Sequence, residues 1–399
     1  MSTTSTETQA TGPGTDPGAA RPFGDLPIRP ELAGEHPYGA PQLDVPVLLN
    51  VNENPYAPSA EVIATIAAEV SRAAATLNRY PDREFTALRD DLRAYLALES
   101  GACLDELAVW AANGSNEVML HLLQAFGGPG RTALSFAPTY SMYPEYARDT
   151  HTRWVTARRE TDFTVDPARA AAGIAEHRPS VILLASPNNP TGTALPLSTV
   201  EAVLAAASQA DPDTPAVVVV DEAYAEFRRA GTPSAVGLLA GHPNLAVTRT
   251  MSKAFAAAGA RVGYLAAGPQ LVDALRVVRL PYHLSAITQA VARAALRHRE
   301  TLLAQVDTLR AERDALVAWL REQRAPDGRA LDVPDSDANF VLFGTFADRH
   351  AVWQGLLDRG VLIRETGPDG WLRVSVGTPE ENAAFRDALT HVIEETKTA

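Results

Sequence analysis

Cysteine, lysine and long apolar runs are scarce in this 399-residue sequence. The single cysteine, Cys103, excludes an internal disulfide and shows no metal-ligand spacing, so we expect no metal site. A lone thiol fits a reducing compartment, and we expect a cytoplasmic protein. No run of about 18 apolar residues is present, and no charged segment followed by an apolar one opens the sequence. We therefore expect neither a membrane span nor a secretory signal.

Positive charge is also in deficit, with a formal net charge of −13 at pH 7. Because binding to nucleic-acid phosphates needs a basic surface, we expect no nucleic-acid partner. Small anionic ligands are still compatible with this charge, since two or three local arginines are enough to bind them. The composition, 46% hydrophobic and 21% charged, is typical of a globular protein, and the length allows two domains with a large core.

Lysine is so rare that its position is informative. Among 35 basic residues only Lys253 and Lys397 are lysines, and Lys397 lies next to the C-terminus. Arginine therefore serves wherever a permanent positive charge suffices, but it cannot give up its proton. Lys253 lies among small and apolar residues and suits a task that needs a neutral amine, such as a Schiff base with a carbonyl cofactor. The competing interpretation is an ordinary surface lysine at a strand end.

From residue 107 onwards, short apolar runs alternate with helical segments. Residues 181–184 and 217–220 are apolar on both faces, as in a mostly parallel sheet covered by helices on both sides. We therefore predict an α/β fold, with a large domain whose mostly parallel seven-stranded sheet is flanked by helices, and a smaller α+β domain. The predicted strands of the large domain are 107–112, 132–136, 181–185, 216–220, 245–248 and 262–266.

Composition and periodicity divide the chain into four parts. Residues 1–22, rich in Thr, Ser, Gly and Pro, are predicted to be a disordered tail, and residues 23–45 an N-terminal arm. The order of helices and strands after residue 288 predicts a small α+β domain made of residues 46–75 and 289–399. Residues 76–288 would then form the large, cofactor-binding domain. Helices are predicted at 59–74, 85–98, 117–126 and 347–359, and further strands at 339–343 and 372–376.

Polar residues follow five successive predicted strands. In a sheet of this kind the carboxyl ends of the parallel strands lie on one edge, where ligands bind. The five clusters together suit the parts of pyridoxal 5'-phosphate. They are Asn113-Gly-Ser-Asn, Pro138-Thr-Tyr, Ser186-Pro-Asn-Asn-Pro-Thr-Gly, Asp221-Glu-Ala-Tyr and Thr250-Met-Ser-Lys.

Individual side chains in these clusters match groups of that cofactor. Lys253 would hold the aldehyde as an imine. Asp221 ends a buried apolar strand, where an ionised carboxylate needs a partner such as a protonated pyridine nitrogen, and that pairing keeps the ring an electron sink. Tyr224 would hydrogen-bond the phenolic oxygen of the ring, and Tyr140 would stack on its face. Alternatively, Asp221 caps the next segment and Tyr224 is a half-buried structural tyrosine.

The cofactor phosphate would bind where residues 113–116 lead into a predicted helix. Backbone N–H groups at a helix start bind phosphate, and Gly114 lets the backbone approach closely. Ser252 and Arg261, on either side of Lys253, would complete the phosphate site. Many turns between a strand and a helix resemble residues 113–116. This cluster alone is therefore a weak indication of a phosphate site, and it counts only together with the other four clusters.

These motifs together resemble the fold-type I pyridoxal-phosphate aminotransferases of the class II subgroup, and within them the histidinol-phosphate aminotransferases. The resemblance runs from residue 50 to about residue 377 and covers nearly all of the chain except the tail. The motifs that carry it are Asn52-Glu-Asn-Pro-Tyr, Arg79-Tyr-Pro, Pro138-Thr-Tyr-Ser-Met-Tyr, Ser186-Pro-Asn-Asn-Pro-Thr-Gly, Asp221-Glu-Ala-Tyr-Ala-Glu-Phe, Thr250-Met-Ser-Lys-Ala-Phe, Pro281-Tyr-His-Leu-Ser, Ser336-Asp-Ala-Asn-Phe and Leu372-Arg-Val-Ser-Val-Gly.

The resemblance implies a role for each matching residue. The catalytic residues would be Lys253, Asp221 and Tyr224, with Lys253 as imine lysine and catalytic base. Tyr80 would reach the cofactor phosphate of the neighbouring subunit, so that the active unit is a homodimer with shared sites. The implied substrate-binding residues are Tyr56, Arg364, Arg373 and Asn189. The implied cofactor-binding residues are Lys253, Asp221, Tyr224, Asn189, Tyr140, Ser115, Asn116, Ser252, Arg261 and Tyr80.

The reaction implied is a ping-pong transamination through a Lys253 aldimine. L-Glutamate would give its amino group to the cofactor and leave as 2-oxoglutarate, and imidazole-acetol phosphate would accept that group and leave as L-histidinol phosphate, a step of histidine biosynthesis. Two arginines suit both substrates, because a guanidinium binds a carboxylate or a phosphate. The alternatives are an aromatic amino-acid aminotransferase, a phosphothreonine-type decarboxylase and a non-catalytic cofactor-sensing protein, all with the same fold.

Overall fold

The computed structural model describes residues 26–105 and 107–398, and the chain forms two units, residues 1–39 and 40–399. The described part of the first unit contains a short 3-10 helix, Pro30–Leu32. The predicted disordered tail, residues 1–22, lies outside the described residues. The elements below belong to the second unit.

A seven-stranded sheet lies at the centre of the second unit and confirms the predicted α/β fold class. Its strand order is β2-β8-β7-β6-β5-β3-β4. Strand β8 runs antiparallel to both of its neighbours, and the other neighbouring pairs are parallel. In chain order the strands are β2 (Ala108–Ala112), β3 (Thr132–Ala137), β4 (Arg153–Arg158), β5 (Val181–Ala185), β6 (Val217–Asp221), β7 (Leu245–Thr250) and β8 (Gly263–Ala267).

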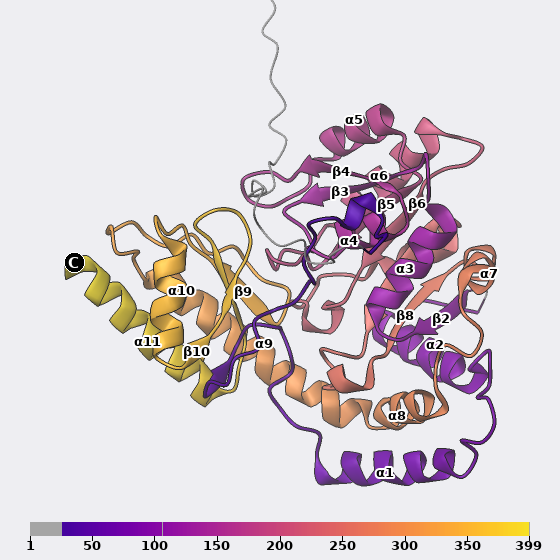
Figure 1. Cartoon of the computed structure of the whole chain (residues 1–399), viewed down its shortest axis with the longest axis horizontal. Coiled ribbons are helices and arrows are strands. Elements are labelled where there is room, and N and C mark those ends of the chain that lie inside the picture. Colours follow the sequence, from indigo (N-terminus) through magenta and orange to yellow (C-terminus); the bar gives the residue numbers. More distant parts are fainter. Residues whose placement is uncertain (1–25, 106, 399) are drawn as a thin grey trace, which may run out of the picture. The chain divides into compact units, whose positions relative to one another are not determined.

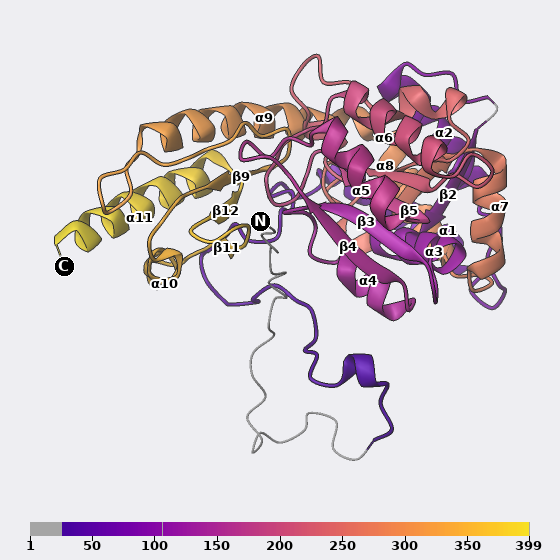
Figure 2. The ribbon, with the colours of Figure 1, turned by 90° about the horizontal axis from the view of Figure 1, so that it is seen from above.

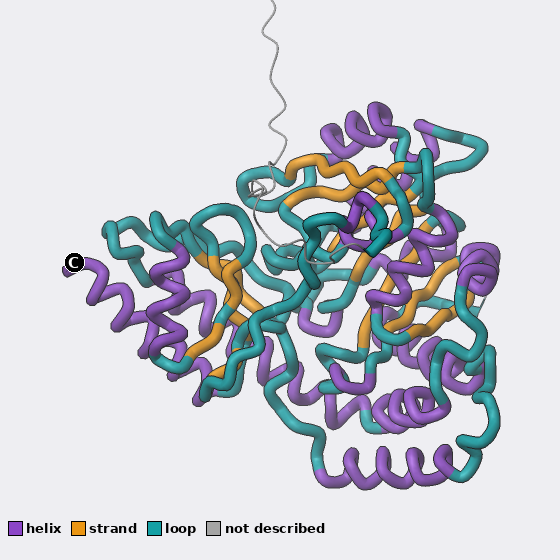
Figure 3. Tube along the Cα trace, viewed as in Figure 1, coloured by secondary structure: helices purple, strands orange, loops and turns teal. Residues whose placement is uncertain are grey.

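Buried strands in the middle of this sheet are apolar on both faces, as predicted. All residues of β5 and β6 are buried, and β6 is a run of valines that ends in Asp221. Such strands need helices on both sides, and helices surround the sheet in Figures 1 and 3. These helices are α2 (Thr86–Ser100), α3 (Ser115–Phe126), α4 (Tyr143–Asp149), α5 (Pro167–His177), α6 (Leu197–Ala210) and α7 (Pro269–Val278).

Strand β4 was missing from the strands predicted individually. It lies at the edge of the sheet, pairs only with β3 within the sheet, and begins and ends with arginine. Edge strands often carry charged side chains, and these interrupt the apolar pattern from which strands are predicted. The sequence alone therefore gave too weak a signal at residues 153–158.

A second hydrophobic cluster lies around smaller sheets in the C-terminal part. Three antiparallel strands form one of them in the order β11 (Arg364–Glu365), β12 (Leu372–Ser375) and β9 (Phe340–Phe343). The predicted strands at 339–343 and 372–376 and the predicted helix at 347–359 are confirmed to within two residues. The other elements are β1 (Val47–Leu48), paired in parallel with β10 (Val361–Leu362), α10 (Arg349–Asp358) and α11 (Pro379–Thr398).

One long helix, α9 (Arg299–Glu322), belongs to both hydrophobic clusters. Its first half contributes Leu302 and Val306 to the cluster around the large sheet, and its second half contributes Leu316 and Leu320 to the other. Figure 2 shows α9 running past both groups of elements. Helix α9 therefore joins the two hydrophobic clusters, because each half of it packs into one of them.

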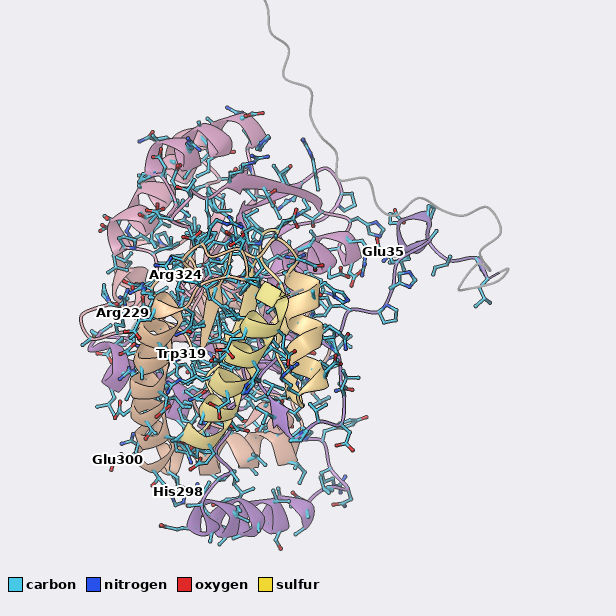
Figure 4. The ribbon with its side chains drawn as sticks, turned by 90° about the vertical axis from the view of Figure 1, so that its left-hand side faces the viewer. Glu35, Arg229, His298, Glu300, Trp319 and Arg324 are labelled. Carbon is cyan, nitrogen blue, oxygen red and sulfur yellow. The ribbon has the colours of Figure 1, made fainter. Side chains whose placement is uncertain are left out.

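Helix α1 (Ala60–Ala74) packs against α8 (Ala286–Arg297). Its first turn is capped by Ser59, whose side chain accepts a hydrogen bond from the backbone of Val62. His298, labelled in Figure 4, ties the pair together through a 2.8 Å hydrogen bond between its Nε2 and Thr65 Oγ1. The division into a large domain at 76–288 and a small one at 46–75 and 289–399 stays a prediction.

Candidate active site

The carboxyl ends of β6 and β7 bring the central polar residues together. Asp221, the last residue of β6, lies opposite Thr248 of β7. Strand β7 ends at Thr250, and the turn that follows carries Ser252 and Lys253. Two clusters predicted to meet at one edge of the sheet are therefore neighbours there.

Lys253 is partly buried at this edge, and its Nζ donates a 2.9 Å hydrogen bond to the carbonyl oxygen of Val51. Burial lowers the pKa of Lys253 from 10.5 to about 8, because the charged form loses its hydration. The positive charges of Arg373 and Arg261 lower this pKa further, and Glu53 opposes them. The amine can therefore lose its proton near neutral pH, which an ordinary surface lysine cannot.

Asp221 is buried, and both of its carboxylate oxygens accept hydrogen bonds. Tyr143 Oη donates to one at 2.8 Å and Thr248 Oγ1 to the other at 3.1 Å. Burial raises the pKa of Asp221, which these two hydroxyl donors oppose. Neutral donors compensate a buried carboxylate only in part, so a cation in the site would stabilise its ionised form.

Tyr224 accepts hydrogen bonds from two amide groups. Asn52 Nδ2 lies 3.1 Å and Asn189 Nδ2 3.4 Å from its hydroxyl oxygen, and its ring packs edge-on against Phe340 at 5.0 Å. The other end of Asn189 accepts a 2.6 Å hydrogen bond from Arg373 Nη1. One connected network therefore joins the predicted ring-oxygen residues to a predicted substrate arginine.

An anion cradle lies at the start of α3. Gly114 precedes this helix with φ of +86°, and a Cβ atom there would clash with the Arg261 guanidinium. Arg261 Nη1 also donates to Ser252 Oγ at 3.3 Å. Since a helix leaves its first N–H groups without intrahelical partners, the backbone of Ser115 and Asn116 can donate to an anion beside this guanidinium. The cradle has the donors that a phosphate group needs.

Arg364 and Arg373 are paired residues of the antiparallel strands β11 and β12. Side chains of directly opposed residues project to the same face of a sheet, so both arginines extend from one face of the β11–β12 pair. Arg373 is buried, donates from Nη2 to Asn50 O at 2.9 Å, and lies over the ring of Phe340. The pair is thus placed to receive an anionic ligand from one side.

Of the other predicted tyrosines, Tyr140 lies beside a part of the site just described. Tyr140 packs edge-on against Tyr143, the donor to Asp221, with ring centroids 5.6 Å apart. Tyr56 is partly buried, and burial together with Glu312, Glu380 and Glu381 raises the pKa of its hydroxyl.

Tyr80, by contrast, lies on the surface. Its side chain is 80% exposed and stacks on Tyr282, with ring centroids 4.4 Å apart. We therefore do not expect Tyr80 to contact the cofactor that its own chain binds.

Sequence reasoning missed several residues of the site. Tyr143 and Thr248 hydrogen-bond Asp221, and Asn52 and Ser375 belong to the Tyr224 network. Tyr143, Asn52 and Ser375 stand inside motifs that had been singled out, but their roles depend on pairs distant in sequence. No periodicity or spacing could have identified them.

Metal and membrane features were searched over residues 26–105 and 107–398. Within them, no group of three or more His, Cys, Asp or Glu side chains is placed to hold a metal ion. No helix of this part of the chain has both the length and the apolar character needed to cross a membrane.

Comparison with known proteins gives consistent matches. The family model for aminotransferase class I and II matches residues 45–389. The histidinol-phosphate aminotransferase of Thermobifida fusca is 62% identical over 92% of this chain and 95% of its own length. The one from Bifidobacterium longum is 58% identical over 92% of this chain and 97% of its own length.

Solved structures share the fold. The histidinol-phosphate aminotransferase of Sinorhizobium meliloti, solved in complex with pyridoxal-5'-phosphate, aligns with a TM-score of 0.72 at 24% identity and covers 88% of this chain and 92% of its own. At this identity the likeness shows the architecture, and the residue roles must be argued from the geometry above.

Proposed function

This chain belongs to the class I and II aminotransferases, and we propose that it acts as a histidinol-phosphate aminotransferase with pyridoxal 5'-phosphate as its cofactor. It would move an amino group between L-glutamate and imidazole-acetol phosphate, giving 2-oxoglutarate and L-histidinol phosphate in histidine biosynthesis. One observation carries the proposal: at the end of β7 a partly buried lysine, Lys253, has its pKa lowered to about 8 by burial and by the charges of Arg373 and Arg261. The expected cytoplasmic location is part of the proposal.

The residues present fit this cofactor. Its phosphate would lie in the anion cradle, where Gly114 leaves room and Arg261, Ser252 and the start of α3 supply donors. Its ring nitrogen would carry the positive charge that the buried Asp221 carboxylate calls for. Tyr224 and Asn189 would bind its phenolic oxygen, and Tyr140 would stack on its ring.

Bound pyridoxal phosphate supplies an electron sink for the carbanion that forms at the substrate α-carbon. Lys253 Nζ takes the proton from that carbon as general base, and burial, Arg373 and Arg261 favour its neutral form. Tyr143 and Thr248 orient the Asp221 carboxylate. The site therefore shifts Lys253 towards its neutral form, and the two hydroxyl donors favour the ionised form of Asp221 against the effect of burial.

The arginine pair would select the substrates. Arg373 and Arg364 project from the same face of the β11–β12 pair, and each guanidinium can bind a carboxylate or a phosphate through two parallel hydrogen bonds. One site can thus accept glutamate and histidinol phosphate in turn, as a ping-pong reaction requires. Tyr56 would cover the bound substrate.

A homodimer with shared active sites is also part of the proposal. Tyr80 and Tyr282 stack on the surface, and Val277 and Leu280 nearby in the chain are 83% and 75% exposed. Large exposed apolar side chains close together favour a protein interface. In such a dimer the Tyr80 hydroxyl would reach the cofactor phosphate bound by the other subunit.

Half-reactions test the substrate assignment. Cofactor-loaded protein is mixed separately with L-glutamate, L-histidinol phosphate, L-phenylalanine and phosphothreonine, and the visible absorption of the cofactor is followed. Rapid bleaching by glutamate and histidinol phosphate is expected. Faster bleaching by phenylalanine would support the aromatic aminotransferase instead, and carbon dioxide released from phosphothreonine would support a decarboxylase.

The variant Arg373→Ala serves as a check on the same assay. Its apparent KM for histidinol phosphate should rise more than about tenfold, since a hydrogen bond to a charged group contributes about 1.5–3 kcal/mol. An unchanged KM would remove Arg373 from the substrate site.

A further inference from the structure

We propose that Asn52 is a positioning residue that forces the Tyr224 hydroxyl to donate its proton into the active site. This inference rests on the proposed function, because the acceptor would be the phenolic oxygen of the cofactor. Asn52 lies in the loop between β1 and α1, far from Tyr224 in sequence, and both side chains are buried.

The orientation of the Asn52 amide follows from its partner Ser375. The backbone N–H of Asn52 donates to Ser375 Oγ at 2.9 Å, and Ser375 Oγ donates its own proton to Asn52 Oδ1 at 3.0 Å. With Oδ1 turned towards Ser375, the NH₂ end of Asn52 faces Tyr224, at 3.1 Å.

The orientation of Asn189 is fixed in the same way from the other side. Its Oδ1 accepts from Arg373, and a guanidinium can only donate. Its NH₂ group therefore faces the Tyr224 oxygen, at 3.4 Å. Two amide donors thus occupy the accepting positions of one hydroxyl oxygen, and the remaining proton of that hydroxyl must itself be donated.

The backbone around Asn52 holds this geometry. Asn52 has φ of +56°, a conformation that Asn and Gly adopt more readily than other residues, and Asn339 Nδ2 donates to its carbonyl oxygen at 3.0 Å. The carbonyl groups of the two preceding residues accept from Arg373 and Lys253. Residues 50–52 are therefore in contact with the lysine, the substrate arginine and Tyr224 at once.

As a consequence, the Tyr224 hydroxyl would always donate to the phenolic oxygen of the cofactor. A donated hydrogen bond stabilises negative charge on that oxygen and weakens its attraction for a proton on the neighbouring nitrogen that links lysine to cofactor. Without Asn52, the Tyr224 hydroxyl can rotate and point its proton away from the phenolic oxygen, towards the position that the Asn52 amide had occupied. The pKa of the nitrogen that would link Lys253 to the cofactor should then rise. This pKa is read as the pH midpoint of the change in the cofactor's visible absorption.

The test is a pH titration of the visible absorption of cofactor-loaded protein. It measures the protonation of the nitrogen between Lys253 and the cofactor and does not depend on turnover. The variant Asn52→Gly removes the amide and still accommodates the positive φ. We expect it to raise the pKa by about 0.5–1, the equivalent of one neutral hydrogen bond. Asn52→Asp, which has the same shape but accepts, should turn the Tyr224 proton away and raise the pKa at least as much as Tyr224→Phe.

Two further variants separate positioning from folding. The double variant Asn52→Gly with Tyr224→Phe should show no larger shift than Tyr224→Phe alone, because Asn52 acts through that hydroxyl. Ser375→Ala leaves Asn52 in place but releases its amide, and it should raise the pKa in the same direction. The control Asn244→Ala, which removes an amide at the other end of β7, should leave the pKa unchanged.

The outcomes divide cleanly. If Tyr224→Phe raises the pKa while Asn52→Gly and Ser375→Ala leave it within about 0.2 of the wild type, Asn52 does not position the hydroxyl; additive shifts in the double variant would also overturn the inference. If the wild-type protein shows no absorption of a bound cofactor at all, the proposed function itself fails, whereas an absorption that is present but the same at every pH in the wild type and in Asn52→Asp would overturn the inference alone.

Discussion

The charges around Lys253 govern how the site responds to pH. Its pKa is lowered to about 8, so the cofactor-free protein carries a growing fraction of neutral amine as the pH rises through that value. Only the neutral amine attacks an aldehyde. The rate of cofactor binding should therefore rise about tenfold per pH unit below pH 8 and level off above it.

The same charges predict how this profile moves in a variant. Since Arg373 lowers the pKa of Lys253, Arg373→Gln should raise that pKa and move the midpoint of the binding rate to higher pH. Stopped-flow absorbance measures both profiles. Arg279→Gln serves as control, because Arg279 lies over the Trp110 ring and is paired with Glu84. If the midpoint is the same in the wild type and in Arg373→Gln, the charge of Arg373 does not lower the pKa of Lys253.

Gly114 tests the anion cradle at the same scale. In Gly114→Ala the added Cβ would clash with the Arg261 guanidinium and displace it. Loss of a charge-assisted hydrogen bond should weaken cofactor binding about tenfold to a hundredfold, measured by equilibrium titration. Gly101→Ala is the matched control, with φ of +68° and open space around its Cβ. Equal affinity of Gly114→Ala and Gly101→Ala would argue against a phosphate at this place.

Buried ion pairs beyond the active site connect β7 to helix α2 and to the segment that follows β6. Arg249 is almost fully buried and contacts carboxylates of Glu222, Glu226 and Glu99 at 2.7, 3.1 and 2.9 Å. Its neighbours in β7 hydrogen-bond Asp221 and Ser252. These ion pairs therefore support the strand ends that carry the site.

Removing Arg249 should be costly because its three carboxylates would lose a common cation. We expect Arg249→Met to lower the free energy of unfolding by about 3–5 kcal/mol, measured by denaturant titration at neutral pH. Arg276→Met, at an exposed ion pair with Glu84 and Asp273, should lower it by only about 0–1 kcal/mol. Similar losses in both variants would show that the buried ion pairs have no special weight.

The elements differ in how far the sequence determines them. The valine run of β6 and the capped helix α1 were predicted closely, because burial on both faces and helical periodicity leave a local pattern. Strands β4 and β11 were not predicted, since an edge strand with terminal arginines and a two-residue strand carry little pattern. The pairing of Arg364 with Arg373 depends on β11, so it appeared only in the structure.

At the candidate site, the residues proposed to act on the cofactor could be predicted from residue type and position. The residues that hydrogen-bond them could not. The scarcity of lysine pointed to Lys253, and the end of a buried strand pointed to Asp221. Asn52, Tyr143 and Thr248 contribute through hydrogen bonds to residues distant in sequence. Such contacts depend on the folded chain and leave no local signal.

At the scale of the whole molecule, the proposed dimer with shared sites gives a prediction that a single chain cannot give. Each site would combine Lys253 of one subunit with Tyr80 of the partner subunit. Lys253→Ala protein should be inactive, and Tyr80→Ala protein should bind the cofactor weakly. Unfolded together and refolded as an equal mixture, about half of the dimers are hybrids with one intact site in two, so about a quarter of wild-type activity should return at limiting cofactor.

The outcome of that mixing experiment depends directly on site sharing. If the sites were complete within one chain, the hybrids would contain no site with both Lys253 and Tyr80 intact. Activity would then stay at the average of the two separate variants. Different affinity tags on the two variants allow dimers that carry both tags to be purified, which checks that hybrids have formed.

The central claim is that the amine of Lys253 binds the cofactor covalently, and borohydride reduction followed by peptide mass mapping measures this most directly. The lysine-poor sequence makes the result clear, because Lys397 is the only other lysine in the chain and serves as an internal control. We predict a pyridoxyl group on the peptide that contains Lys253 and none on the peptide that contains Lys397. A label on Lys397, or no label after incubation with pyridoxal phosphate, would contradict the account.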